Sequence, residues 1–572
     1  MSNFEIKRKD LAGRIGKLKT KHGEIETPTI LPVVNPNKIT LNSQELKETG
    51  SKAIITNAYI LKKDHLHEVI TQGIHNFLDF HGPIMTDSGA YQLMRYGNLE
   101  INNREILEFQ EKINTDIGVM LDIPTESEKE KEIHKTVKKT IERAKESEEY
   151  IKNKETLHVG PLQGWKKPKI FRECVKKQSK LEFDLHALGS IVPTMEKYRY
   201  SKLMEPLRII KEEIPENRPI HLFGAGHPML MPFLVAMGAD MFDSAAYSLY
   251  AEEGRYLTST GTKKLEEINY LPCNCPVCTK AENNPQNLEK EKTKKKLAKH
   301  NLHVTFKEIN KIKQSIKEGT LYELLETKSR SHPSLKKLMD ELTSDTRTIE
   351  KRDPVSKKHM FVVSEYSKKR PDYRRAIKKA KKIKEEQEKT INTPEFGEVP
   401  LSLMELYPYS HTGREIKEDK RKNIEDLKKL KTASKYWLGK DIVPKDVEIK
   451  KSPKTGKIRK LIRRGELYLV IRASDYMFLL HEAAKKLHRE TKYPKRRIVM
   501  NEEASEFVEK GKTVFNKFVT DIDPELRPGE PVLMVNEEDE LLAAGETYLS
   551  AKEIKEMDRG EAAKNRWKAK RD

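Results

Sequence analysis

The chain has 572 residues, which is too long for one compact hydrophobic core, so several domains are expected. Lysine and arginine total 110 against 89 acidic residues, a formal net charge of +21. An enzyme of small metabolites has no need of that surplus, which favours a polyanionic partner, with nucleic acid ahead of a membrane. A generally lysine-rich, ion-paired composition is the alternative, but the surplus is unevenly distributed along the chain, which favours the partner.

No targeting segment is visible in the sequence. The N-terminus lacks the apolar core of a signal peptide, and no apolar run approaches the length of a membrane-spanning helix. We therefore expect a cytoplasmic protein without a membrane partner. Four cysteines in so long a chain cannot form a disulfide framework. Three of them, Cys273, Cys275 and Cys278, lie within six residues and indicate a metal in a reducing compartment.

The first 245 residues alternate short apolar runs with amphipathic helical stretches. The intervals between the runs are mostly about 25 to 35 residues, the size of one βα unit. Eight units predict a closed (β/α)₈ barrel of the TIM type and disfavour an open sheet. The predicted strands cover residues 27–33, 52–57, 83–87, 117–122, 157–163, 183–189, 219–224 and 239–244.

Polar residues, one glycine and one phenylalanine mark the C-terminal ends of these predicted strands. Any one of them is compatible with a turn or a helix cap. Together they would line one rim of the barrel, and in this fold that rim carries the chemistry. Acids gathered in one mouth repel each other unless a substrate or cation needs them. The residues are Asn57, Asp87, Asp122, Gln163, Gly189, Phe223 and Asp243.

Two carboxylates that flank a sugar ring can break a glycosidic bond, one as nucleophile and one as proton donor. An amide and a carboxylate, such as Gln163 and Asp122, can read the edge of a purine. Tyr91 or Phe223 can stack on an extracted base. The residues alone therefore indicate a nucleoside-directed glycosyl enzyme on a barrel.

Six segments also resemble, in order, the motifs of tRNA-guanine transglycosylases. They are TDSGAYQ (86–92), LDIPT (121–125), GPLQG (160–164), HALGSIVP (186–193), HLFGAGHP (221–228) and FDSAAYSLYA (242–251). The family exchanges a guanine in tRNA for a 7-deazaguanine through a covalent ribosyl-enzyme intermediate, without ATP. The resemblance implies Asp243 as nucleophile and Asp87 as general acid and base. It also implies a base-binding set, Ser88, Tyr91, Asp122, Gln163, Gly189 and Phe223.

The sequence departs from the family wording at two places. Ala90 and Tyr91 stand in the first motif, and Gly189 is followed by Ser190 where two glycines are usual. Both departures keep the size or the aromatic class of the residue, so we expect them to affect the choice among similar bases more than the activity itself.

The cysteine cluster and a later histidine predict a zinc site. The spacing C-x-C-x₂-C followed by a distant histidine is typical of a closed Cys₃His tetrahedron, which makes the ion structural, one per chain. The predicted ligands are Cys273, Cys275, Cys278 and His300. His300 is preferred to His303 because it matches the His-Asn pair of the family. Magnesium is expected only through the tRNA, and a direct role for it stays open.

The composition shifts beyond residue 330. We expect a charged helical or α+β module at 331–425 around a basic helix at 368–389, and a small α/β module at 426–494 with a basic β-hairpin at 451–468. Residues 495–572 alternate like a small β-barrel with one helix and resemble the PUA RNA-binding domain, with an unrelated β-barrel as the alternative. Lys510 and Lys512, beside Gly511, are the candidate RNA contacts.

The domain order resembles that of the archaeal branch of the family. It consists of a barrel with a zinc-binding insertion at 1–330, then small α+β modules and a terminal PUA domain. That resemblance implies a homodimer that replaces guanine in the tRNA D-arm, at position 15, by 7-cyano-7-deazaguanine (preQ0), the first step towards archaeosine. A nucleoside hydrolase on the same barrel and an inactive tRNA-binding partner remain alternatives, although the three retained aspartates argue against inactivity. The archaeosine-forming paralogue is a third alternative, but its expected Pro-Cys-rich signature is missing from the C-terminal half.

Overall fold

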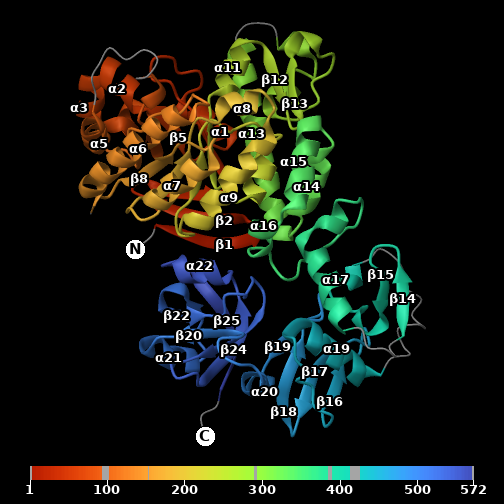
Figure 1. The fold of residues 1–572 in the computed structure, drawn as a ribbon. Coiled ribbons are helices and arrows are strands. Elements are labelled where there is room, and N and C mark those ends of the chain that lie inside the picture. The colour runs from red at the N-terminus through yellow and green to blue at the C-terminus, as the bar shows by residue number, and fades with distance from the viewer. Residues whose placement is uncertain are drawn as a thin grey trace.

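The computed structural model describes residues 3–92, 102–152, 154–288, 293–383, 389–411 and 425–569. A large N-terminal barrel lies above a smaller C-terminal half, and a short N-terminal sheet lies between them (Figure 1). Within the described ranges, no helix combines the length and the apolar composition needed to cross a membrane.

Eight parallel strands form the barrel. The hydrogen-bonded order runs from β5 through β6, β7, β8, β9, β10 and β11 to β4, and a parallel bridge between Val33 and Ile55 joins β4 to β5. Every strand that the sequence predicted is present, so the (β/α)₈ prediction is confirmed. The strands are β4 (Thr29–Pro32), β5 (Ile54–Asn57), β6 (Ile84–Asp87), β7 (Ile117–Val119), β8 (Leu157–Leu162), β9 (Leu185–Leu188), β10 (Ile220–Leu222) and β11 (Met241–Ser244).

Helices cover the outside of the barrel and bury one apolar stripe each. In α6 (Glu130–Ile151) the buried residues Ile133, Val137, Ile141 and Ala144 recur at the three- and four-residue spacing of one helix face. The other covering helices are α2 (Ala58–Asp64), α3 (Leu66–Phe77), α5 (Asn103–Lys112), α7 (Pro168–Gln178), α9 (Met204–Glu213), α10 (Met231–Ala236), α11 (Ala246–Glu252) and α13 (Thr293–Glu318).

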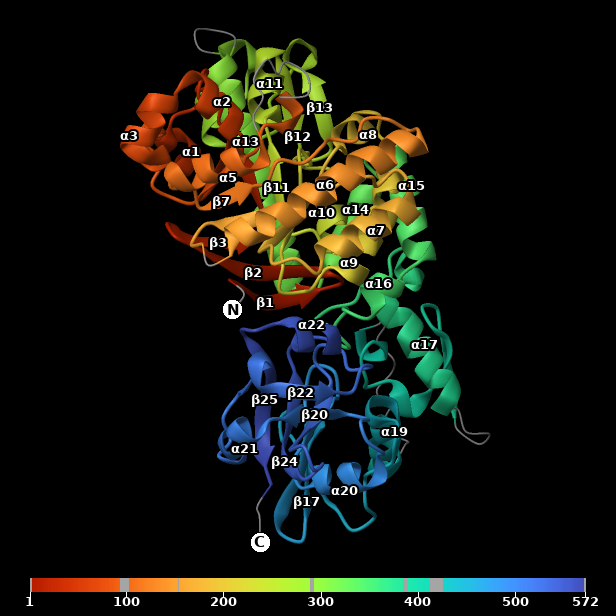
Figure 2. The ribbon, with the colours of Figure 1, turned by 60° about the vertical axis from the view of Figure 1, so that its left-hand side comes forward.

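A three-stranded antiparallel sheet, which the sequence did not lead us to expect, precedes the barrel. It consists of β1 (Phe4–Asp10), β2 (Gly13–Thr20) and β3 (Gly23–Thr27). Phe4, Leu18 and Ile25 share one buried cluster with the interior residues Met85 and Met241 of the barrel. The sheet thus closes the barrel end opposite the rim where the strands finish, which leaves that rim as the open end (Figure 2).

The chain after the barrel first adds helices to it. Leu335, Leu338 and Leu342 of α15 (Pro333–Ser344) belong to the same buried cluster as the barrel helices, as do residues of α14 (Leu321–Ser329). The next segment contains α17 (Pro371–Ile383), the hairpin β14 (Thr390–Thr393) and β15 (Gly397–Pro400), and α19 (Asp426–Leu438). Residues 384–388, the end of the predicted basic helix, lie outside the described residues.

The basic hairpin predicted at 451–468 is present within a four-stranded antiparallel sheet. Its strands are β16 (Glu448–Lys451), β17 (Ile458–Arg463), β18 (Glu466–Ile471) and β19 (Phe478–Leu480), followed by α20 (Ala483–Glu490). Gly456, with a φ of 63°, lies in the connection between β16 and β17. A left-handed conformation favours glycine, which agrees with the turn predicted from the sequence.

The last unit is a six-stranded sheet in the order β21-β25-β24-β23-β20-β22. Its strands are β20 (Arg497–Met500), β21 (Val514–Phe515), β22 (Val519–Ile522), β23 (Pro531–Val535), β24 (Leu541–Thr547) and β25 (Glu561–Lys568). The expected helix is α21 (Glu502–Glu509). A second helix, α22 (Ala551–Glu556), was not predicted.

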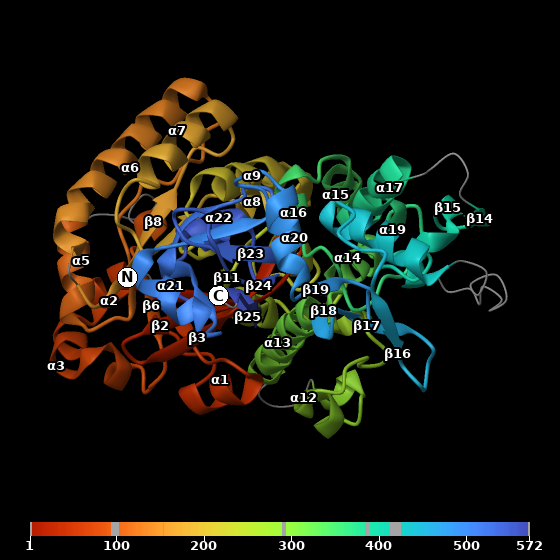
Figure 3. The same cartoon turned by 90° about the horizontal axis from the view of Figure 1, so that it is seen from below.

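Helix α22 lies between this unit and the closed end of the barrel: it is next to β1 in Figure 2 and lies over the barrel in the view from below (Figure 3). Glu553 forms a buried ion pair with Lys9 of β1. The backbone N–H of Glu216 donates to the Glu556 carboxylate at 2.8 Å, and Lys552 Nζ donates to the carbonyl of Lys211 at 2.9 Å. Removal of either partner of the buried pair would leave an uncompensated charge at this contact, so the Lys9–Glu553 pair fixes how the terminal unit meets the barrel.

Candidate active site and metal centre

Three carboxylates meet at the open rim of the barrel. Asp87 ends β6, Asp122 follows β7, and Asp243 lies in β11. Removal from water and the neighbouring charges of Asp122 and Asp243 raise the pKa of Asp87 to about 7. Burial raises the pKa of Asp122 to about 6, although the hydrogen bond from Gln163 by itself lowers it. The structure thus brings the three predicted acids together, and Asp87 titrates where a general acid and base is most effective.

The Asp243 carboxylate is held through one of its two oxygens. His221 Nε2 lies 2.8 Å from Oδ1, and the backbone N–H of Gly224 donates to the same oxygen at 3.0 Å. His221 is fully buried, and its Nδ1 has no partner within the described part of the chain. A proton on Nδ1 would be a buried unpaired donor, so Nε2 carries the proton and donates to Asp243. The second oxygen, Oδ2, accepts no hydrogen bond from the residues that the structure describes.

Asn57 holds the Asp87 carboxylate, a role that the sequence did not assign. Its Nδ2 donates to Asp87 Oδ2 at 3.1 Å, and the backbone N–H of Gly89 donates to the same oxygen at 3.2 Å. Asn57 Oδ1 accepts from the N–H of Ile60 and so caps α2. The helix cap and the Asp87 contact fix the same side chain, which sets the orientation of the carboxylate.

Asp122 and Gln163 form a joined polar pair. Gln163 Nε2 donates to Asp122 Oδ2 at 2.6 Å, and the glutamine is almost fully buried. A Cβ at Gly189 would lie 2.5 Å from Gln163 Nε2, so any larger residue at position 189 would displace the amide. Arg143 Nη1 donates to the carbonyls of Leu121 and Asp122 at 3.3 and 3.2 Å and fixes the strand end beneath the pair.

The remaining base-binding candidates differ in exposure. Ser88 is fully buried, and its Oγ has no hydrogen-bond partner among the described residues. Phe223 is half-buried with its ring centroid 5.0 Å from that of His221. Tyr91 is 43% exposed, at the edge of residues 93–101, which lie outside the described ranges. Phe223 therefore lies beside the Asp243 site, and Tyr91 is an aromatic residue that is partly exposed to solvent.

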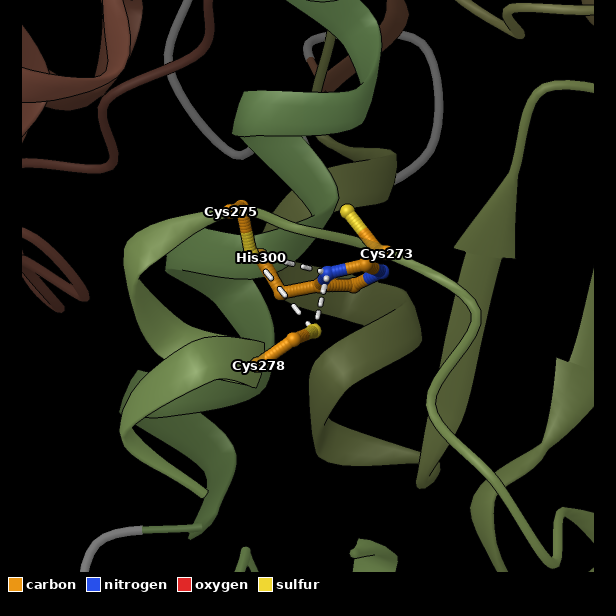
Figure 4. A group of neighbouring side chains, drawn as sticks. All are labelled: Cys273, Cys275, Cys278 and His300. Carbon is orange, nitrogen blue, oxygen red and sulfur yellow. Dashed lines mark hydrogen bonds between the residues drawn. The ribbon is translucent and has the colours of Figure 1, made fainter. Parts of the chain in front are cut away.

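The predicted metal ligands form a compact group (Figure 4). The Cys275 and Cys278 sulfurs are 3.6 Å apart and lie 3.4 and 3.3 Å from His300 Nδ1. The sulfur of Cys273 completes a set in which all four ligand atoms lie within 4.8 Å of one another. Tetrahedral zinc, with Zn–S of about 2.3 Å and Zn–N of about 2.0 Å, requires ligand separations of roughly 3.5–3.8 Å. The four residues therefore fit one metal ion such as zinc.

Surrounding groups orient the histidine of this cluster. His300 Nε2 lies 2.9 Å from the carbonyl of Leu257, which fixes the proton on Nε2 and leaves Nδ1 as the ligand. The Tyr256 ring stacks on His300 with centroids 3.7 Å apart, and its hydroxyl lies 3.3 Å from the Cys278 sulfur. These contacts join the cluster to β12 (Arg255–Thr258), directly after α11.

A second group, His22, His75 and Asp116, lies at the closed end of the barrel. His22 Nδ1 and His75 Nε2 lie 3.0 and 2.9 Å from different oxygens of Asp116. The backbone N–H groups of His22 and Ile84 add one donor to each oxygen. Burial alone would raise the pKa of Asp116, but these hydrogen bonds lower it to about 2. The Asp116 carboxylate thus accepts four hydrogen bonds, two at each oxygen. Because His22 lies in the turn between β2 and β3, these bonds hold that turn against the closed end of the barrel.

Lys510 and Lys512 lie on either side of Gly511, at the end of α21. Both lysines are exposed, and Gly511 has a φ of 86°. Phe507 and Phe515, with 54% and 44% of their surfaces exposed, flank the same loop. Exposed cations beside exposed aromatic rings are typical of a surface that binds single-stranded nucleic acid.

A (β/α)₈ barrel with three carboxylates at its open rim, followed by a small β domain with exposed cations and aromatic rings, fits an enzyme that acts on glycosidic bonds in RNA. Comparison with known families agrees, because the family described as queuine tRNA-ribosyltransferase matches residues 10–334. The C1 domain of tRNA-guanine transglycosylase dimerisation matches 354–422, the patch-forming domain C2 matches 437–494, and the PUA domain matches 496–567. The chain belongs to the tRNA-guanine transglycosylase family and is a tRNA ribosyltransferase.

Relatives along the whole chain narrow this class. The chain is 42% identical over 573 residues to the tRNA-guanine(15) transglycosylase of Thermococcus onnurineus, which covers 98% of each protein. It is also 42% identical over 580 residues to the tRNA-guanine(15) transglycosylase of Pyrococcus furiosus, and this alignment covers 99% of this chain and 98% of the relative. It is 38% identical to that of Methanococcus aeolicus, with 98% of this chain and 99% of the relative covered.

Proposed function

We propose that this chain is a tRNA-guanine(15) transglycosylase that exchanges guanine 15 of the tRNA D-arm for preQ0, the first step of archaeosine synthesis. The observation that carries the proposal is that Asp87, with its pKa near 7, and Asp243, whose Oδ2 has no hydrogen-bond partner among the described residues, converge at one rim of the barrel. Whole-length relatives with that name support the choice of reaction.

Asp243 is the proposed nucleophile. Its Oδ2 attacks C1′ of the ribose, the bond from C1′ to N9 of guanine breaks, and Asp87 gives its proton to the departing base. The ribose is then esterified to Asp243. In the second step N9 of preQ0 attacks C1′ while Asp87 takes up the N9 proton, and Asp243 leaves as a carboxylate. One glycosidic bond is broken and one is formed, so no outside energy is required.

The base is held by the Asp122–Gln163 pair and the Gly189 backbone. Guanine presents two N–H donors and one carbonyl acceptor on one edge, and the carboxylate and amide match these groups. Ser88 supplies a buried hydroxyl without a partner among the described residues. Phe223 and Tyr91 supply the aromatic faces that an extracted base needs.

Zinc is the proposed occupant of the Cys273, Cys275, Cys278 and His300 cluster. When bound, it would cross-link the loop that carries the three cysteines to α13 and would take no part in the reaction. The cluster uses four protein ligands, which leaves no position for substrate. Magnesium is proposed to act through the folded tRNA.

The C-terminal modules are proposed to hold a rearranged tRNA. Position 15 is buried in the tRNA elbow, so the D-arm must open before the barrel can reach it, and contacts elsewhere must offset that cost. Lys510 and Lys512 are the proposed phosphate contacts of the PUA unit. We propose units at 1–330, 331–425, 426–494 and 495–572, where α15, at the start of the second unit, packs on the barrel helices. We also propose a cytoplasmic homodimer formed through the second unit, which contains the matched dimerisation domain.

The test is incubation of full-length enzyme with unmodified tRNA and radiolabelled preQ0 or guanine, followed by mapping of the label. Incorporation at position 15 is expected, with Asp243→Asn as the inactive control. Release of guanine without incorporation would indicate a hydrolase. Binding of tRNA without either reaction would indicate an inactive partner, and action only on tRNA that already contains preQ0 would indicate the paralogue.

A further inference from the structure

Ser190 adopts a backbone conformation that serine avoids. It follows Gly189 directly after β9, and its φ is 59°, in the left-handed region. Glycine enters this region freely, whereas a Cβ makes it unfavourable. The contacts of the serine side chain show what this conformation positions.

The Ser190 hydroxyl has a fixed direction. The backbone N–H of Thr125 donates to Ser190 Oγ at 3.0 Å. Because a backbone N–H can only donate, Oγ is the acceptor in this bond, and its own proton is free for another partner. That partner is Gln163 Oε1, 3.0 Å away, which the Thr125 N–H also approaches at 3.3 Å.

The Thr125 N–H and the Ser190 hydroxyl together determine which end of the Gln163 amide is the oxygen and which is the nitrogen. Two donors converge on one end of the amide, so that end is the carbonyl oxygen and the other end is the NH₂ group. Nε2 donates one hydrogen to Asp122 Oδ2 at 2.6 Å, and within the described part of the chain it has no other acceptor. The second hydrogen is therefore available to a bound base, and Gln163 offers a donor.

We propose that Ser190 is a specificity-determining residue, which locks the Gln163 amide so that the pocket accepts a 6-oxo purine or 7-deazapurine and rejects a 6-amino one. A 6-oxo group accepts the free Nε2 hydrogen, whereas a 6-amino group would place two donors face to face. Without the hydroxyl, Gln163 Oε1 keeps only the longer contact with the Thr125 N–H, at 3.3 Å, and Asp122 alone holds the other end, so the turned amide that would accept from a 6-amino group costs less free energy to reach. The inference rests on the proposed function, since it concerns the base that this site exchanges.

The experiment compares full-length wild type with Ser190→Ala and Ser190→Gly. Both variants remove the hydroxyl, but only glycine also relieves the backbone. Dissociation constants are measured by calorimetry for guanine, hypoxanthine and 2,6-diaminopurine. We expect the preference for guanine over 2,6-diaminopurine to fall about tenfold in both variants, the size of one ordinary hydrogen bond. The ratio of guanine to hypoxanthine should stay constant, because both bases carry the 6-oxo group.

An unchanged guanine to 2,6-diaminopurine ratio in both variants would overturn the inference. So would a proportional weakening of all three bases, which a merely structural role predicts, or a change in Ser190→Ala alone, which would assign the effect to backbone strain. The binding measurement needs no turnover. Wild type that binds these bases with the expected preferences but incorporates none into tRNA would defeat the proposed function and leave this inference standing.

Discussion

Replacement of Asp87 by asparagine should change the pH dependence of stability in a defined direction. The folded protein holds the Asp87 proton up to a pKa of about 7, whereas the unfolded chain releases it near 3.8. Between these values the folded state binds the extra proton, so wild-type stability is lost as the pH rises through this window. Asparagine cannot ionise, and it can keep both hydrogen bonds that Asp87 Oδ2 accepts.

The magnitude follows from the pKa. Between pH 5 and pH 7 Asp87 is protonated in the folded state and ionised in the unfolded state. Over these two pH units the free energy of unfolding of the wild type falls by about 1.4 kcal/mol per unit. Allowing for solvent at the open rim, Asp87→Asn should gain roughly 2 kcal/mol relative to wild type between pH 5 and pH 8. For a barrel of this size, about 1.5 °C per kcal/mol gives a relative rise in Tm of roughly 3 °C.

The assay is thermal unfolding of both proteins from pH 5 to pH 8, with the difference in Tm plotted against pH. Asp116→Asn is the matched control, since the pKa of Asp116 is lowered to about 2. Its carboxylate stabilises the fold above pH 3.8 and loses that effect only as the pH falls towards 2, so this variant should be less stable than wild type throughout the range. A Tm difference for Asp87→Asn that stays flat with pH would refute the reasoning.

Three further predictions concern other parts of the molecule. Cys278→Ser should lower the metal content from about one ion per chain towards zero and reduce Tm, as measured by elemental analysis and unfolding; a variant that keeps its metal would exclude Cys278 as a ligand. Reversal of Lys510 and Lys512 to glutamate should raise KM for tRNA at least tenfold and lower the salt slope by about 1.5, with kcat unchanged, whereas the same reversals on two exposed lysines of α6 should do less. His221→Phe should lower kcat by about 10- to 100-fold with little change in KM for tRNA, because one charge-assisted hydrogen bond to Asp243 is lost; equal losses in both parameters would indicate a collapsed site.

The barrel could be predicted because its signals are local. Each strand is a short apolar run, and the rim residues stand where the runs end, so the sequence alone was enough to group Asp87, Asp122 and Asp243. The cysteine spacing predicted a metal cluster for the same reason. The N-terminal sheet was missed because glycine and lysine interrupt the apolar pattern of β2, GRIGKLKT.

The contacts that orient the site could not be predicted, because strand order places residues at a rim but does not tell which side chains meet there. His221 stands 22 residues from Asp243, and Asn57 stands 30 from Asp87. In the sequence His221 looks like part of a buried strand, and Ser190 looks like a departure from a motif. Helix α22 is only six residues long, and its contact with the barrel depends on the pairing of its Glu553 with Lys9, 544 residues away in the sequence. Only the folded chain supplies these pairings.

Trapping of the covalent intermediate tests the central claim most directly. Full-length enzyme is mixed with unmodified tRNA without free base, denatured, and resolved by electrophoresis, and the linked peptide is identified by mass spectrometry. The proposed chemistry predicts an enzyme–tRNA adduct attached through Asp243 and absent in Asp243→Asn. An adduct on another residue, or base exchange that persists in Asp243→Asn, would contradict it.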